Sequence, residues 1–150
     1  MPKSKPIGME NRIVLDTNIL VSALIGSSYP KQILFECVLE NKFVLCVSEV
    51  ILDEYRDVLN RPKFNKFPNF VEKANSLLDS IEKIAEYYQP TITIARIFDD
   101  ADNRFLELAL TANAHYIITG NFTDFDFAEY EDVKIVNPKY FYEEVCLTTF

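Results

Sequence analysis

Carboxylates stand close to the ends of short apolar segments at several points in this sequence. Asp16 directly follows the apolar run Ile13–Leu15, and Glu54 lies four residues after Val50 and four before Val58, within the apolar stripe of a predicted helix. Two later groups add further oxygen-bearing side chains: Asp99, Asp100, Asp102 and Asn103, then Thr119, Asn121, Asp124 and Asp126. Carboxylate oxygens suit Mg²⁺ or Mn²⁺, and paired hard cations are a recurring means of cleaving phosphodiester bonds. These residues therefore predict a divalent-metal site, with Mg²⁺ or Mn²⁺ as the cofactor.

Each of these carboxylates also has an ordinary structural interpretation. Aspartate is a favoured helix N-cap, so Asp16 fits a cap about as well as it fits catalysis. A carboxylate inside an apolar stripe is costly unless a cation or a metal is near. Glu54 is therefore either a metal ligand, which we favour, or half of a buried salt bridge with Arg56 or Arg104. The single histidine, His115, argues against a zinc site.

Buried strands and helices alternate along the chain and would place these residues at one edge of a sheet. Four apolar runs predict strands: Arg12–Asp16, Phe43–Val47, Tyr116–Thr119 and Val133–Val136. Helical spacing and cap signals predict the helices Asn18–Ile25, Pro30–Glu40, Ser48–Leu59, Phe70–Tyr88, Asp102–Asn113 and Pro138–Val145. The pattern predicts a three-layer α/β fold, with a mostly parallel central sheet flanked by helices on both faces. In such folds the site lies at the carboxyl ends of the strands.

Length and composition favour one globular domain. The chain has 150 residues, of which 49% are hydrophobic and 25% charged, and we predict a flexible N-terminal tail at 1–11 and one domain at 12–146. No apolar run approaches the ~20 residues of a membrane helix, so no membrane association is expected. The cysteines Cys37, Cys46 and Cys146 are odd in number and lack CxxC spacing, which is typical of free thiols in a cytoplasmic protein.

The chain is strongly acidic, with a formal net charge of −8. This charge excludes a general nucleic-acid-coating protein, because phosphate neutralisation needs surplus lysine and arginine. It does not exclude an enzyme that acts on nucleic acid, since bound cations change the local field. The candidate RNA-binding residues, with two phenylalanines beside them for base stacking, are Arg56, Arg61, Lys63, Lys66, Phe64 and Phe67. The alternative for this segment is an ordinary solvated basic loop.

Several groups of residues, in this order and at these spacings, resemble the PIN domain family, of the kind found as VapC-like ribonuclease toxins in prokaryotic toxin–antitoxin pairs. The likeness runs from Arg12 to about Val145. Its segments are Ile13–Leu24, Ser48–Tyr55, Val58–Leu59, Arg61–Phe64, Asp99–Ala109, Tyr116–Asn121, Asp124–Phe125 and Ile135–Phe141. The resemblance implies a PIN-like, Rossmann-like fold and a Mg²⁺- or Mn²⁺-dependent endoribonuclease. It also implies RNA as the substrate and an antitoxin protein as a partner.

A quartet of acidic residues that bind metal and carry catalysis is a further implication of the resemblance. Asp16, Glu54 and Asp102 match its first three positions. Many family members have an aspartate directly after Thr-Gly, where this chain has Asn121, and we assign the fourth position to Asp124. Residues beside the quartet that could contact metal, water or phosphate are Asp99, Asn103, Asn121, Thr17, Asn18 and Thr119.

The departure at Asn121 keeps a second interpretation open. This is a PIN-like protein with a depleted metal site that binds RNA or a partner without cutting. A metal-dependent phosphatase fits less well, because it needs a second aspartate just after Asp16, where Thr17 and Asn18 stand. A homodimer is also expected, since the predicted helix Phe70–Tyr88 and its aromatic neighbours offer more apolar surface than one domain easily covers.

Overall fold

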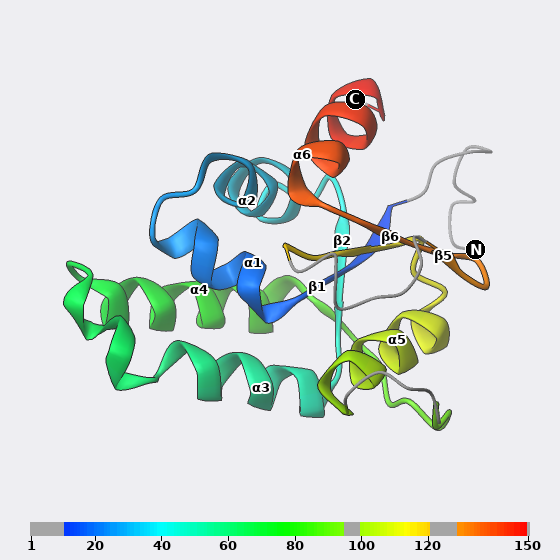
Figure 1. Ribbon diagram of the computed structural model, residues 1–150, viewed down its shortest axis with the longest axis horizontal. Helices are drawn as coiled ribbons and strands as arrows, with labels where there is room; N and C mark the ends of the chain where they lie inside the picture. Colours follow the sequence, from blue (N-terminus) through cyan, green and yellow to red (C-terminus); the bar gives the residue numbers. More distant parts are fainter. Residues whose placement is uncertain (1–10, 95–99, 121–128, 150) are drawn as a thin grey trace.

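A six-stranded, mostly parallel sheet forms the centre of the described part of the protein (Figure 1). The structure is a computed structural model that describes residues 11–94, 100–120 and 129–149, with the backbone alone at 100–102 and 149. The strand order is β3-β2-β1-β4-β6-β5, and every pairing is parallel except that of β5 with β6. The strands are β1 Arg12–Leu15, β2 Val44–Val47, β3 Glu86–Tyr87, β4 Tyr116–Ile118, β5 Glu129–Tyr130 and β6 Val133–Val136.

Helices flank the sheet and complete a three-layer α/β fold, as the sequence predicts (Figure 1). Parallel crossovers are right-handed, and the steps β1→β2 and β3→β4 run in opposite directions along the sheet, so α5 lies on the opposite face from α1–α4. Helix α5 packs against β1, β2 and β4, whereas α4 packs against α1, α3 and β2. The helices are α1 Thr17–Leu24, α2 Ser28–Gln32, η1 Ile33–Val38, α3 Glu49–Leu59, η2 Pro62–Lys66, α4 Phe70–Ile84, α5 Asp100–Ala112, α6 Pro138–Tyr140, η4 Phe141–Cys146 and α7 Leu147–Thr149.

The apolar runs of the sequence form the core because helices cover both faces of the sheet. The side chains of β1 from Ile13 to Leu15 are completely buried, as are Ile117 and Ile118 of β4. Helix α3 begins at Glu49 because Ser48 caps it: the Ser48 Oγ accepts a hydrogen bond from the Ile51 N–H at 3.2 Å. No helix within the described residues is both long and apolar enough to cross a membrane.

The strand order reverses direction at β1, which lies between β2 and β4. Such a switch point opens a crevice outside the carboxyl ends of the two diverging strands. Leu15 of β1 pairs with Ile118 of β4. The residues that follow each of them, Asp16 and Thr119, are therefore placed side by side at this edge. The chain topology brings the first predicted site residue to the crevice.

Three predicted helices differ from the structure, and the last of them, Pro138–Val145, consists of the short helix α6 followed by the wider turn η4. The predicted helix Phe70–Tyr88 ends at Ile84, because Glu86 and Tyr87 pair with β2 as the edge strand β3. The predicted helix Pro30–Glu40 consists of α2 followed by the wider turn η1, in which the Leu39 N–H bonds to the Leu34 carbonyl five residues back. In these places the backbone hydrogen bonds depart from the regular helix that the periodicity of the sequence predicts. The predicted tail, apart from Asn11, lies outside the described residues.

Candidate active site

Asp16 and Thr119 are joined at the carboxyl edge of the sheet. The Thr119 Oγ1 donates a hydrogen bond to the Asp16 Oδ2 at 2.6 Å, and the Asp16 backbone N–H donates to the Ile118 carbonyl at 3.0 Å. Thr119 is 0% exposed, so bulk water does not compete for its hydroxyl. The Asp16 carboxylate is therefore held in a defined orientation at the end of β1.

Asp16 also stands at the N-cap position of α1, but its side chain makes no capping hydrogen bond. Its backbone carbonyl accepts from the Ile19 N–H at 2.9 Å, as any residue at this position does. A capping aspartate would use its carboxylate on the amides of the first turn. Because the carboxylate of Asp16 bonds Thr119 instead, the geometry favours the functional interpretation over the cap.

Glu54 reaches the same region from α3. The Thr17 Oγ1, in the first residue of α1, donates to the Glu54 Oε2 at 3.1 Å. Glu54 is half-buried, while Asp53 beside it faces solvent with a side chain that is 73% exposed. The predicted apolar stripe is narrower than expected, because Val50 is 50% exposed. Helix α3 thus presents Glu54, and not Asp53, toward the start of α1.

The salt-bridge alternative for Glu54 is not what the structure shows. Arg56 pairs with Asp53 at 3.1 Å and with Glu82 at 2.5 Å. Glu54 forms no ion pair with any residue that the structure describes, and Thr17 is the hydrogen-bond partner of its carboxylate there. A half-buried carboxylate without a protein cation is suited to binding a metal ion.

Tyr55 is a further residue of this site, and the sequence pattern did not single it out. Its side chain is 0% exposed, and its hydroxyl donates to the Leu15 carbonyl at 2.6 Å. Burial raises the pKa of the Tyr55 phenol well above its ordinary value, and the negative charges of Asp16 and Glu54 raise this pKa further. Both carboxylates therefore lie close to one phenol. The sequence signal that could have identified Tyr55 is a hydroxyl-bearing residue on the buried face of the helix, directly after Glu54.

The donor set of this edge suits a hard cation. Asp16, Glu54, Thr17 and Thr119 offer oxygen atoms alone, which Mg²⁺ and Mn²⁺ prefer. Among the described side chains, no three from His, Cys, Asp and Glu come together as a complete metal-binding group. The described part of the site therefore fits a divalent ion but supplies two of the four predicted carboxylates.

A profile of the PIN domain family matches residues 12–123, which covers β1, α3 and β4 and so every described residue of the site. The chain belongs to the PIN domain family. A relative of this PIN domain protein is the uncharacterized protein MJ1680 of Methanocaldococcus jannaschii. It is 29% identical over 145 residues, which cover 89% of this chain and 90% of the relative.

The fold is also similar to that of a solved structure. The crystal structure of VapBC2 from Rickettsia felis bound to a DNA fragment from their promoter contains a chain that superposes with a TM-score of 0.54. The sequence identity is 21%, and the match covers 84% of this chain and 98% of that chain. At this identity the likeness establishes the PIN-type fold.

Several other predicted site residues lie partly or wholly outside the described residues. Asp99, Asn121 and Asp124 are outside the described residues, and Asp102 is described by its backbone alone, in the first turn of α5. Helix α5 runs back to the amino end of β4, so its first turn lies at the carboxyl edge of the sheet. Asn103 is buried in that turn, while Asn18 is exposed on α1.

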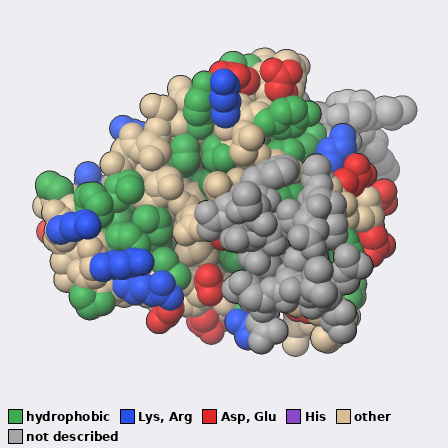
Figure 2. All heavy atoms as spheres, in the orientation of Figure 1, with side chains coloured by type: hydrophobic (Ala, Val, Ile, Leu, Met, Phe, Trp, Pro, Cys, Tyr) green, Lys and Arg blue, Asp and Glu red, His purple; other side chains and the backbone are tan. Residues whose placement is uncertain are grey.

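Of the predicted RNA-binding residues, Arg56 lies in the last turn of α3, and Arg61, Lys63 and Lys66 follow the end of that helix. Figure 2 shows Lys and Arg side chains gathered at the left of the molecule, where the α3–α4 connection lies in Figure 1. Arg56 and Arg61 are already paired with carboxylates, Arg61 with Asp57 at 3.3 Å. Lys63 and Lys66 are exposed, with their ammonium groups over the Phe64 and Phe67 rings at 5.2 and 5.4 Å. Because both rings are half-buried against Phe70, they offer less surface for base stacking than the sequence predicted.

Proposed function

We propose that this PIN domain protein is a Mg²⁺- or Mn²⁺-dependent endoribonuclease that hydrolyses RNA phosphodiester bonds. The observation that carries the proposal is the convergence of Asp16 and Glu54, from two different elements, at the switch-point edge of the sheet. Membership of the PIN domain family supports it. So does the absence of an ion pair to Glu54 among the described residues.

In this proposal Asp16, Glu54, Asp102 and Asp124 hold the ion. When bound, it would supply a Lewis acid that activates water and stabilises the charge developing on the phosphate. The protein's own hydroxyls orient the two described carboxylates: Thr119 fixes Asp16, and Thr17 fixes Glu54. Asn18 is exposed at the start of α1, where it is free to contact the substrate backbone.

A cleavage assay tests this function. Incubation with single-stranded RNA and Mg²⁺ or Mn²⁺ is expected to give endonucleolytic products, and excess EDTA is expected to abolish them. Re-addition of the divalent ion should restore cleavage. Cleavage that persists undiminished in EDTA would exclude the metal mechanism. RNA that is bound but never cut, with either ion present, would favour the non-catalytic interpretation instead.

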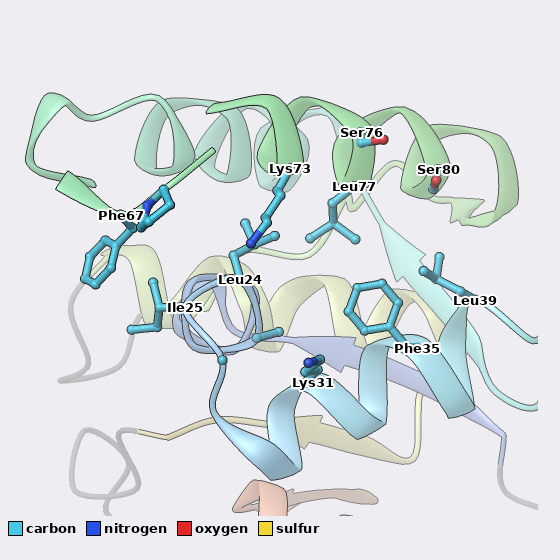
Figure 3. A pocket seen from close by; sticks show the side chains of 13 residues that line it. Leu24, Ile25, Lys31, Phe35, Leu39, Phe67, Lys73, Ser76, Leu77 and Ser80 are labelled. Carbon is cyan, nitrogen blue, oxygen red and sulfur yellow. The ribbon is translucent and has the colours of Figure 1, made fainter. Parts of the chain in front are cut away.

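We further propose that the protein is the toxin of a toxin–antitoxin pair, and that its antitoxin docks in a cavity beside α1. The cavity has a volume of about 550 Å³ and lies between the end of α1, the α2–η1 segment and α4 (Figure 3). Leu24, Phe35 and Leu77 form apolar walls, and Lys31 and Lys73 enter from opposite sides. In a chain with net charge −8, this lysine pair favours a partner segment that combines apolar and acidic side chains.

Assembly experiments test this partner proposal together with the expected homodimer. Light scattering of the protein alone is expected to give twice the 17.4 kDa of one chain. An antitoxin encoded beside the gene should inhibit cleavage, and the variant Lys31→Glu/Lys73→Glu should escape that inhibition while cleaving normally. Lys83→Glu, on the same helix but outside the cavity lining, is the matched control. Inhibition unchanged in the double variant would place the antitoxin elsewhere, and a monomer across the micromolar range would exclude the dimer.

The apolar surface that this segment offers to the proposed dimer is smaller than the sequence suggested. Phe70 is 2% exposed and packs into the chain's own core. Val71 and Tyr87 remain 43% and 49% exposed on and just after α4. These two residues are the apolar contribution of this segment to the proposed interface.

A further inference from the structure

Two consecutive residues of α3 hold the two residues on either side of Asp16. The Tyr55 hydroxyl donates to the backbone carbonyl of Leu15 at 2.6 Å, and the Thr17 hydroxyl donates to the Glu54 carboxylate at 3.1 Å. Leu15 is the last residue of β1, and Thr17 is the first of α1. The turn that carries Asp16 is therefore attached to α3 both before and after this residue.

The two attachments are different in kind. The bond from Thr17 ends on the Glu54 carboxylate, the group that we propose also binds the ion. The bond from Tyr55 ends on a backbone carbonyl, and both of its residues are completely buried. Away from water this bond has no competing partner and keeps its geometry. It therefore fixes the distance between the end of β1, which precedes Asp16, and helix α3, which carries Glu54.

We infer that Tyr55 is a positioning residue for the divalent-ion site: its hydroxyl, bonded to the Leu15 carbonyl, sets the separation of the Asp16 and Glu54 carboxylates. This inference rests on the proposed function. Tyr55 does not touch the ion or the substrate, since its hydroxyl is used on Leu15 and its side chain is 0% exposed. Its effect is carried by the backbone of β1 to Asp16 and by the helix to Glu54.

A fixed separation matters more for a small ion than for a large one. Mg²⁺ demands near-ideal octahedral geometry at short distances, whereas Ca²⁺ accepts flexible and irregular oxygen shells. Loosening the bond between Tyr55 and Leu15 should therefore weaken Mg²⁺ binding more than Ca²⁺ binding. A general loss of stability would not separate the two ions in this way.

The test compares the variant Tyr55→Phe with Tyr142→Phe in the full chain without RNA. The Tyr142 hydroxyl makes an equally short bond, 2.6 Å to the Glu36 carboxylate, and neither residue is among those that we assign to the site. Mg²⁺ and Ca²⁺ affinities are measured by displacement of Mn²⁺, followed by electron paramagnetic resonance. We expect Tyr55→Phe to weaken Mg²⁺ binding about 10-fold, the loss typical of a residue that orients a metal ligand. Ca²⁺ binding should change much less, and Tyr142→Phe should leave both affinities unchanged.

Rescue completes the experiment. Para-aminophenylalanine at position 55 keeps a hydrogen-bond donor at the ring end and is expected to restore most of the Mg²⁺ affinity. If Tyr55→Phe does not fold, the para-aminophenylalanine variant carries the test. We then expect a smaller loss of Mg²⁺ affinity, in the same direction. Equal Mg²⁺-to-Ca²⁺ selectivity in the wild type and the Tyr55 variants would overturn the inference alone. A wild-type protein that binds none of the three ions would overturn the proposed function, and this inference with it.

Discussion

Replacing Asp16 with asparagine is expected to lower the rate of RNA cleavage by about 10²–10³-fold, the loss typical when one group that stabilises transition-state charge is removed. Asp16 follows β1 directly at the switch point of the sheet, and Thr119 and the Ile118 carbonyl hold it there. Asparagine keeps an oxygen that can accept the Thr119 hydrogen bond but removes the negative charge. The measurement is the single-turnover cleavage rate of a labelled RNA at saturating Mg²⁺.

The same variant should fold as well as the wild type, or better. In the absence of metal, Asp16 and Glu54 are like charges at neighbouring positions, since Glu54 accepts a hydrogen bond from Thr17, the residue after Asp16. Asp16→Asn removes one of these charges, so the melting temperature of the metal-free protein should be unchanged or raised. An inactive variant that also melts at a much lower temperature would mean that Asp16 is chiefly a structural residue.

Glu54→Gln is expected to reduce cleavage by about 10²-fold or more, whereas Asp53→Asn should leave the rate within a factor of about 2. The two residues are neighbours on α3 with opposite surroundings. Glu54 is half-buried and bonded by Thr17, while the Asp53 side chain is 73% exposed and paired with Arg56. Cleavage rates of the two variants, measured in parallel at several Mg²⁺ concentrations, test the assignment. Equal damage from both changes would show that the functional face of α3 has been assigned wrongly.

Local sequence signals were sufficient to predict the strand and the helix that carry the described site residues. The apolar run before Asp16 forms the buried strand β1, and Ser48 caps α3 as predicted. The mostly parallel sheet follows from the alternation of buried strands with helices, and the structure confirms it. These features depend on side-chain period and on caps, which neighbouring residues determine.

The position at which helix α4 ends is determined by a strand that is distant in sequence. The periodicity of Phe70–Tyr88 continues past Ile84, but the backbone of Glu86 and Tyr87 pairs with β2. Periodicity shows which face of a helix is apolar and does not show where a sheet edge needs another strand. For the same reason Val50, apolar and at the right spacing, is half exposed, since no element of the described chain covers it fully.

The sequence by itself determined that carboxylates stand at Asp16 and Glu54, on a strand end and on the inward side of a helix. Only the tertiary structure decided which hydroxyls hold them. The bonds of Thr119 to Asp16, Thr17 to Glu54 and Tyr55 to Leu15 span 103, 37 and 40 positions of the chain. Contacts at such separations depend on the strand order and on how α3 packs beside α1, which no local pattern encodes. The physical reason is that a buried hydroxyl must find an acceptor, and the fold determines which acceptor lies within reach.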